Sequence, residues 1–440
     1  MQWEITAKCN NNCIHCYNYW REEDQNYSHS FTLPELISIA DQIIKNHIFD
    51  VTLTGGEPLL FWKHLPFVIG KLISAGVDVN LNSNLTLLTS VVAQRLKKAG
   101  LRSILVSVLA NKEEVHDCIA NRQGAWKQTV NGIKIAVANN FTVSANMVLL
   151  RQNYNLLYET AAFLQQLGIK TFSATKASPA LNRRNFDRLR LNKKQLQESL
   201  ELLVKIKNEL GMNVDILECY PLCLIGDVKK FSHFARRSCT AGVTTCTVGS
   251  TGEVRPCSHA DMSYGNILEE NLSPIWKHMT DWREGKYIPE ECHICKFLQM
   301  CSGGCRMEAK YLGSICGKDP YMTSANDVIF NSNTPKVYRS TNLCQNDEEY
   351  ILQSDCKFRQ EIFGAIVKNK TTGAFLVNTD GYNILKKISS QKSFSIERIA
   401  REFDIFPANV KKFLAPLINK RVINSVKSRV AQNSAKINNR

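Results

Sequence analysis

Three cysteines near the start of the chain are spaced to hold an iron–sulfur cluster. Cys9, Cys13 and Cys16 form a C-x3-C-x2-C run directly after the first run of strand-forming residues. Three thiolates on one loop can bind three irons of a cubane and leave the fourth iron open for an exchangeable ligand. A tetrahedral zinc site is the alternative, and it would need a fourth ligand such as His15. The spacing of the run and its position after a strand favour the cluster.

The composition supports metal ligation as the role of the cysteines. The chain has 440 residues, of which 44% are hydrophobic and 16 are cysteines, as in a globular protein of several domains. It begins Met-Gln-Trp-Glu without a basic and apolar leader, and no apolar run is long enough to cross a bilayer. We therefore expect a cytoplasmic protein with no membrane partner, in which disulfides are rare.

The elements that must position the cysteine loop alternate between strand and helix patterns over the first 213 residues. Short β-type runs are separated by amphipathic stretches, several of which end in glycine. The predicted strands are 2–6, 51–54, 77–81, 103–108, 142–149 and 171–174, and the predicted helices are 33–46, 66–75, 91–99, 125–138 and 156–167. This order predicts an α/β fold, a partial (β/α)6 TIM-like barrel that works at the carboxyl ends of its strands.

With a second motif, the cysteine loop resembles the radical S-adenosylmethionine (SAM) superfamily. The family signature is C-x3-C-x2-C, and here His15 stands in its aromatic position. The sequence from Thr54 to Pro58, Thr-Gly-Gly-Glu-Pro, resembles the family's GGEP motif, which binds the SAM amino group. Glycines let the backbone approach a ligand, and the Glu57 carboxylate suits an ammonium. The resemblance implies reductive cleavage of SAM to a 5′-deoxyadenosyl radical, which abstracts a hydrogen atom from the substrate.

Weaker matches to the family continue along the barrel. The stretch Ser83-Asn84-Leu85-Thr86 resembles the family's TNGT, with leucine in place of glycine, and Ser107 resembles a serine near the SAM ribose. The stretch from His116 to Gly124 resembles HDxxRG before a helix. The SAM-binding residues implied in this way, with two polar residues near the end of the fifth strand, are Gly55, Gly56, Glu57, Pro58, Asn84, Ser107, Asn146 and Arg151.

A later group of cysteines resembles the SPASM extension of peptide-modifying radical SAM enzymes. Its pattern is Cys239-x12-Gly252-x4-Cys257, followed by a C-x2-C-x5-C-x3-C run that ends at Cys305. The resemblance implies two auxiliary 4Fe–4S clusters. The first would be held by Cys239, Cys246, Cys257 and Cys305, and the second by Cys292, Cys295, Cys301 and a later cysteine. A double zinc ribbon is the alternative.

The last ligand of the second cluster departs from the family pattern. Relatives commonly end in a DPxC stretch, whereas here Asp-Pro-Tyr is followed by Met322. Cys316 is the nearest replacement, and Cys344 is the next. Cys219 and Cys223 flank a proline at the barrel exit, and a structural role is expected for them because free cysteine is among the most buried residue types.

The C-terminal part carries most of the positive charge. Residues 355–440 hold 17 basic and 6 acidic residues, a net +11 of the chain's +15. Two β-type runs, 362–368 and 374–378, precede helical patterns at 378–389, 395–404 and 407–420, which is the order of a winged helix. DNA binding is one interpretation. The sequence of this part also resembles the pyrroloquinoline-quinone peptide-chaperone family, in which a leader peptide adds as a strand to the sheet edge. The residues expected to bind it are Ala374, Phe375, Leu376, Val377, Lys411 and Lys412.

Together these features predict a radical SAM maturase of a ribosomally made precursor peptide. The expected domains are a barrel (1–215), a SPASM domain (216–320), a linker (321–354), a winged-helix peptide-recognition domain (355–426) and a basic disordered tail (427–440). The expected partners are a precursor with an acidic leader and an electron donor such as flavodoxin or ferredoxin, rather than nucleic acid. The expected reaction is crosslinking or backbone rearrangement. Alternatives are sulfatase-maturase-like oxidation, although Ser258 stands where an aspartate is usual, peptide epimerisation, and an iron–sulfur DNA-binding regulator.

Overall fold

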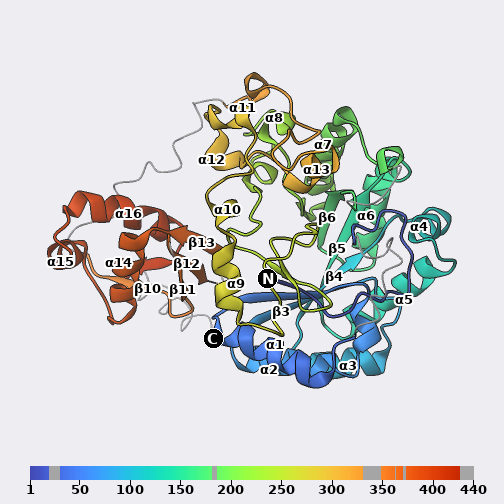
Figure 1. The fold of residues 1–440 in the computed structure, drawn as a ribbon, viewed down its shortest axis with the longest axis horizontal. Helices are drawn as coiled ribbons and strands as arrows, with labels where there is room; N and C mark the ends of the chain where they lie inside the picture. The colour runs from blue at the N-terminus through green and yellow to red at the C-terminus, as the bar shows by residue number, and fades with distance from the viewer. Residues whose placement is uncertain (19–29, 181–185, 331–347, 362, 370–372, 427–440) are drawn as a thin grey trace, which may run out of the picture. The chain divides into compact units, whose positions relative to one another are not determined.

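The computed structural model describes residues 1–18, 30–180, 186–330, 348–361, 363–369 and 373–426 (Figure 1). The chain forms two compact units, Met1–Phe330 and Asn331–Arg440, each with its own hydrophobic core. No helix in the described parts is long and apolar enough to cross a membrane. Cys344, the central part of the expected linker and the expected tail 427–440 lie outside the described residues.

The first unit is built on a nine-stranded sheet in the order β7-β6-β5-β4-β3-β2-β1-β8-β9. Seven neighbouring strands run parallel in chain order: β1 (Gln2–Glu4), β2 (Asp50–Thr54), β3 (Asp78–Ser83), β4 (Ser103–Ser107), β5 (Thr142–Leu149), β6 (Thr171–Lys176) and β7 (Asn213–Asp215). The first six are the predicted strands, so the α/β partial barrel is confirmed. The seventh strand, β7, was not predicted.

Helices cover the outer face of this sheet (Figure 1). They are α1 (Leu33–Lys45), α2 (Leu65–Ser74), α3 (Ser90–Lys98), α4 (Glu113–Ala120), α5 (Ala125–Ala138), α6 (Leu157–Gln166) and α7 (Lys193–Leu210). The first shows why they form where they do: Thr32 and Glu35 make a reciprocal capping box, and Leu36, Ile39 and Ile43 share the buried face. Five of these helices are the predicted ones, and α4 and α7 are additional.

The register of the parallel strands brings polar residues together at one edge of the sheet. Ser107 at the end of β4 lies opposite Asn146 of β5, and Leu149 lies opposite Lys176 at the end of β6. Earlier positions of the parallel strands, such as Leu53 of β2, Leu81 of β3 and Ile104 of β4, are buried. The strands therefore form an apolar core along their length and present polar side chains at their carboxyl ends, where α/β proteins bind ligands.

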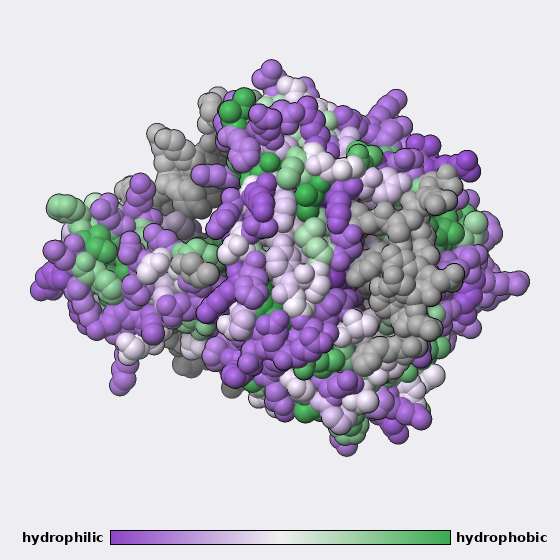
Figure 2. Space-filling view, viewed as in Figure 1, coloured by the Kyte–Doolittle hydropathy of each residue, from purple (hydrophilic) through white to green (hydrophobic). Residues whose placement is uncertain are grey.

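After β7 the first unit consists of short elements. A two-residue strand β8 (Thr247–Val248) pairs parallel to β1, and β9 (Val254–Arg255) pairs antiparallel to β8. The helices of this region are α8 (Leu222–Ile225), α9 (Leu272–His278), α10 (Thr280–Arg283), α11 (Glu290–His293), α12 (Leu298–Cys301) and α13 (Arg306–Tyr311). On the face shown in Figure 2, hydrophobic residues form small separate patches on a mainly hydrophilic surface.

The second unit has strands and helices where the sequence predicted them. A sheet of β11 (Lys357–Glu361), β12 (Gly364–Asn369) and β13 (Gly373–Val377) precedes α14 (Thr379–Ser389), α15 (Ile396–Glu402) and α16 (Pro407–Asn419). The first of these strands was not predicted, nor was the pair of β10 (Tyr350–Leu352) with β14 (Ile423–Ser425). In this sheet β13 is an edge strand, paired only with β12 among the described residues. The winged-helix assignment stays a prediction.

Candidate active site

A pocket at the carboxyl ends of the barrel strands contains most of the residues that the sequence singled out for the first cluster and for SAM. The thiols of Cys9, Cys13 and Cys16 share its lining with the SAM candidates Gly55, Gly56, Glu57, Asn84, Ser107 and Asn146. Two candidates do not line it. Pro58 starts the short 3-10 helix η2 (Pro58–Phe61), and the exposed Arg151 donates from Nε to the Arg190 carbonyl at 2.8 Å.

The cysteine loop is held on one side by the end of α4. The backbone N–H groups of Asn12 and Ile14 donate to the carbonyls of Ala120 and Ile119, at 3.1 and 2.9 Å. Arg122 adds a side-chain bond, from Nε to Asn11 Oδ1 at 2.6 Å. The stretch that resembles HDxxRG therefore fixes the position of the cysteine loop.

The turn after β3 holds the same loop on its other side. Asn84 donates from Nδ2 to Asn10 Oδ1 at 3.0 Å, and Asn10 donates from Nδ2 to Thr86 Oγ1 at 2.7 Å. Leu85 between them has a φ of +57° and is fully buried. It occupies the position where the family stretch has glycine, which adopts such a φ at lower cost.

The two glycines of the GGEP-like motif let two loops pack backbone against backbone. Gly56 N–H donates to the Thr6 carbonyl at 2.7 Å, and Glu57 N–H donates to the Lys8 carbonyl at 2.8 Å. A Cβ added at Gly56 would lie 2.1 Å from the Lys8 carbonyl oxygen. Only glycine fits at this distance, so the motif places its own backbone directly beside the cysteine loop.

The carboxylate of Glu57 accepts hydrogen bonds from three groups of the protein itself. Its Oε1 accepts from Leu59 N at 2.9 Å and from Ser83 Oγ at 2.7 Å, and its Oε2 accepts from Asn84 N at 2.9 Å. Burial raises the pKa of Glu57 to about 7, although these three hydrogen bonds favour the charged form. The side chain thus connects the loops after β2 and β3, which both reach the pocket.

A buried histidine supports the end of β4. His116 lines the pocket, and its Nδ1 accepts from Leu109 N at 3.2 Å. Burial lowers the pKa of His116 to about 4, because the charged imidazolium would lose its hydration. The ring is therefore neutral near pH 7, and Nδ1 is the acceptor that the Leu109 amide needs.

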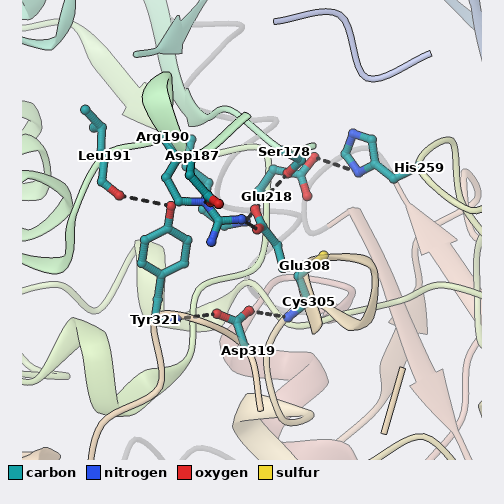
Figure 3. Close-up of polar contacts among 11 residues, drawn as sticks. Ser178, Asp187, Arg190, Leu191, Glu218, His259, Cys305, Glu308, Asp319 and Tyr321 are labelled. Carbon is teal, nitrogen blue, oxygen red and sulfur yellow. Dashed lines mark hydrogen bonds and ion pairs between the residues drawn. The ribbon is translucent and has the colours of Figure 1, made fainter. Parts of the chain in front are cut away.

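Sequence reasoning missed a set of charged and polar pocket residues, which Figure 3 shows in part. Lys176, Ser178, Glu218 and His259 line the pocket with the cysteines. Glu308 of α13 accepts from Lys176 Nζ at 2.7 Å and from Arg190 Nη2 at 3.0 Å. The predicted sixth strand ended at residue 174, two positions before the lysine. The sequence signal that could have identified the lysine as a pocket residue is its position as a polar residue at the end of a strand.

A second buried ion pair positions His259 at the pocket. Arg255 and Glu4 pair with both side chains fully buried, and burial raises the pKa of Glu4 to about 7. Arg255 Nη1 also donates to the carbonyls of Ser258 and Ala260, at 3.0 and 2.9 Å. His259 between them lies 3.8 Å from Glu218 through Nδ1, and its ring meets Tyr17 edge-on at 4.4 Å. Through this ring contact, the turn after β9 touches Tyr17, the residue that follows Cys16.

The cysteines of the SPASM-like pattern form two groups of neighbouring thiols. Cys257 interacts electrostatically with Cys239 and Cys305, and Cys292 does so with Cys295 and Cys301. Cys246 is buried next to β8. Cys316 is exposed, and its thiol donates to the Lys286 carbonyl at 3.7 Å. None of the described cysteines forms a disulfide.

The pocket residues fit a SAM-binding 4Fe–4S cluster. Three thiols of one loop reach the pocket, and a glycine backbone runs along the same loop. This leaves the fourth iron of a cubane for a ligand held by the backbone, which suits the amino and carboxylate groups of an amino acid.

Comparisons with known proteins agree with this geometry. Residues 3–164 match the model of the Radical SAM superfamily, and residues 239–296 match SPASM, an iron–sulfur cluster-binding domain. The AdoMet-dependent heme synthase of Methanosarcina barkeri is 26% identical over 347 residues, which cover 72% of this chain and 94% of the relative. The mycofactocin maturase MftC of Mycolicibacterium smegmatis is 25% identical over 333 residues, 73% and 81% of the two chains.

A solved structure shares the fold. SuiB of Streptococcus suis, crystallised with its precursor peptide SuiA, superposes with a TM-score of 0.59 at 16% identity and covers 74% of each chain. At this identity the likeness is one of fold.

Proposed function

Because this chain is an enzyme of the radical SAM superfamily with a SPASM domain, we propose that it matures a ribosomally made precursor peptide. The reaction would begin with abstraction of a hydrogen atom from the core peptide and end in a crosslink or a backbone rearrangement. The observation that carries the radical chemistry of the proposal is the pocket itself. Its lining combines the cysteine loop with Glu218 and His259, which come from the region beyond the barrel.

The proposal assigns the cofactors to particular thiols. Cys9, Cys13 and Cys16 would hold the cluster that binds SAM, and the later cysteines would hold two auxiliary 4Fe–4S clusters. When bound, the first cluster supplies the electron that cleaves SAM to methionine and a 5′-deoxyadenosyl radical. An electron donor such as flavodoxin or ferredoxin would reduce it. The chain's own part is to hold the cysteine loop still and to enclose the reacting atoms.

Residues of this chain would place the substrate against that site. Lys176 and His259 both line the pocket, and each lies beside a carboxylate: Lys176 pairs with Glu308, and His259 Nδ1 is 3.8 Å from Glu218. Side chains already held by a neighbouring carboxylate lose little freedom when a substrate binds. The pocket is therefore suited to holding one peptide segment in a fixed orientation.

The second unit favours a peptide as the substrate. The enzyme domains alone do not select it, since the heme synthase and the maturase are similar to this chain to nearly the same degree. Within the described residues the strand β13 pairs on one side only, and Leu376 on it is 52% exposed while Val377 faces the core. An edge strand of this kind can pair with an extended peptide. The net charge of +11 over residues 355–440 suits an acidic leader.

The test uses the full-length chain, reconstituted with iron and sulfide without oxygen. Peptides encoded by short reading frames beside the gene are incubated with it, SAM and dithionite, and analysed by mass spectrometry and for 5′-deoxyadenosine. A mass change in one peptide, lost when Cys9, Cys13 and Cys16 are replaced by alanine, is the expected result. The triple variant should also lose about a third of the iron. Cleavage of SAM that leaves every peptide unchanged while a porphyrin precursor is modified would contradict the proposal.

A further inference from the structure

Two cysteines outside the SPASM-like pattern lie among its thiols. Cys219 and Cys223 belong to a short segment that links the barrel to the later cysteines and includes α8. Their thiols stand for the thiolates that would bind iron. The segment places one of them in each of the two groups of cysteines.

Cys219 belongs with the first group. It is buried, with 8% of its surface exposed, and its thiol hydrogen-bonds to the thiols of Cys239 and Cys305. Cys257 in turn interacts electrostatically with Cys239 and Cys305. These four thiols are neighbours contributed by four different parts of the chain.

Cys223 belongs with the second group. Its side chain interacts electrostatically with Cys292 and Cys301. The amide of Leu222, next to it, donates to Cys301 Sγ at 3.4 Å, so the two segments are in direct contact. Thr323 fixes the residue from the other side, with its amide on Cys223 Sγ at 3.3 Å and its hydroxyl on the Cys223 carbonyl at 2.8 Å.

The positions of the two cysteines that the sequence favoured are different. Cys316 is exposed, and its thiol is directed to the Lys286 carbonyl. Cys246 directly precedes β8, and its carbonyl accepts from the Gln2 amide, so it belongs to the edge of the main sheet. In the described residues no three His, Cys, Asp or Glu side chains surround one point as ligands of a single ion would. A cubane has no such need, because its thiolates bind different irons.

We propose that the segment 219–223 supplies one ligand to each auxiliary cluster: Cys219 completes the set of Cys239, Cys257 and Cys305, and Cys223 completes the set of Cys292, Cys295 and Cys301. On ligation each thiol releases its proton as the iron–sulfur bond forms. The inference rests on the two auxiliary clusters of the proposed function and is independent of the substrate. It also connects both clusters to the pocket, since Glu218 adjoins Cys219.

The test is made in the full chain with Cys9, Cys13 and Cys16 replaced by alanine, so that only auxiliary clusters remain. After anaerobic reconstitution, iron and sulfide are counted, and electron paramagnetic resonance is recorded after reduction. The background should hold about eight irons. Cys219→Ala and Cys223→Ala should each lower iron by up to about half, and each should alter a different one of the two signals. Cys118→Ala, an exposed cysteine of α4, and Cys316→Ala are the matched controls and should change neither signal.

Serine variants keep the test decisive where alanine disturbs folding. Cys219→Ser and Cys223→Ser preserve side-chain size, and an oxygen ligand would shift the signal of the affected cluster. Circular dichroism checks that they fold. Unchanged signals in both serine variants would overturn the inference, as would loss of a signal in Cys246→Ala or Cys316→Ala with none in the new pair. A background holding no iron would overturn the auxiliary clusters themselves, whatever peptide the wild-type enzyme modifies.

Discussion

Lys176 and Glu308 form an ion pair that is closed off from solvent. Lys176 Nζ lies 2.7 Å from Glu308 Oε1, and the two side chains are 1% and 0% exposed. Burial alone would lower the pKa of Lys176, but the nearby carboxylate of Glu308 raises it well above the usual value. Because the lysine ends β6 and the glutamate lies in α13, the pair joins the barrel to the cysteine-rich region.

Breaking this pair should destabilise the first unit strongly. Removing one partner of a buried pair leaves an uncompensated charge and costs about 3 to 5 kcal/mol. Glu308→Gln should cost more than Lys176→Met, because the glutamine would remove the carboxylate paired with Lys176 and one of the two carboxylates paired with Arg190. Thermal unfolding of anaerobic protein measures the difference. Glu198→Gln, in the exposed pair with Lys194 on α7, is the control and should change the melting temperature little. Equal small shifts in all three variants would contradict the role of the buried pair.

Replacing Glu57 should weaken SAM binding without removing any cluster. Glu57→Ala leaves Leu59 N, Ser83 Oγ and Asn84 N without their acceptor, at about 1 to 3 kcal/mol for each buried donor. The loops after β2 and β3 should shift, and we expect the SAM affinity to fall by about tenfold or more. Glu57→Gln keeps one acceptor oxygen, and its SAM affinity should lie between those of the wild type and Glu57→Ala. Titration with SAM, together with iron analysis, makes the measurement.

A matched control for this prediction lies on α1. Glu35 also accepts hydrogen bonds from a loop, at Thr32, but outside the pocket. Glu35→Ala should lower stability and leave SAM affinity unchanged. Wild-type affinity in Glu57→Ala would show that the carboxylate is not needed to shape the site.

His116 should make the stability of the first unit depend on pH. Its folded pKa of about 4 lies below the ordinary value of 6.5, so between these values the unfolded chain binds a proton that the folded chain does not. Stability is therefore lost as the pH falls through this window, by up to about 1.4 kcal/mol per pH unit. His116→Asn keeps an acceptor for Leu109 N but does not titrate. The drop in melting temperature from pH 7.0 to 5.5 should be smaller in this variant than in the wild type and in the exposed control His278→Asn. Equal drops in all three would contradict the assignment.

The sequence was a good guide to the barrel because buried parallel strands are short apolar runs, which local composition reveals. It was a poor guide to the charged pocket residues. Lys176 and Glu308 are 132 positions apart, and spacing along the chain does not indicate which buried charges pair. The motif resemblance did point to the backbone conformation of Leu85: the family has glycine at this position, and the leucine here has a positive φ. It gave no reason to group Cys219 with Cys305, because that contact depends on how the chain returns after β7.

Deleting residues 355–440 should abolish modification of the full-length precursor and leave uncoupled SAM cleavage intact. The deleted part holds most of a hydrophobic core of its own, including Val367, Leu385 and Leu414, so its loss removes little from the core of the first unit. A leader held on the edge of β13 would make the encounter of the core peptide with the pocket intramolecular. Such tethering is typically worth about 10² to 10⁴ in apparent affinity.

The charge of the second unit provides a sharper version of the same test. Binding of an acidic leader should weaken as salt rises, because attraction is screened beyond about 8 to 10 Å at physiological ionic strength. The double charge reversal Lys411→Glu and Lys412→Glu on α16 should raise the KM for the full-length precursor and leave that for a leaderless core peptide unchanged. Charge reversal at Lys386 of α14 and at the exposed Lys392 is the matched control for the same change in net charge. Modification of the full-length precursor at the wild-type rate by the truncated enzyme would refute recruitment, and sequence-specific DNA binding by the full chain would favour a regulatory role for this unit.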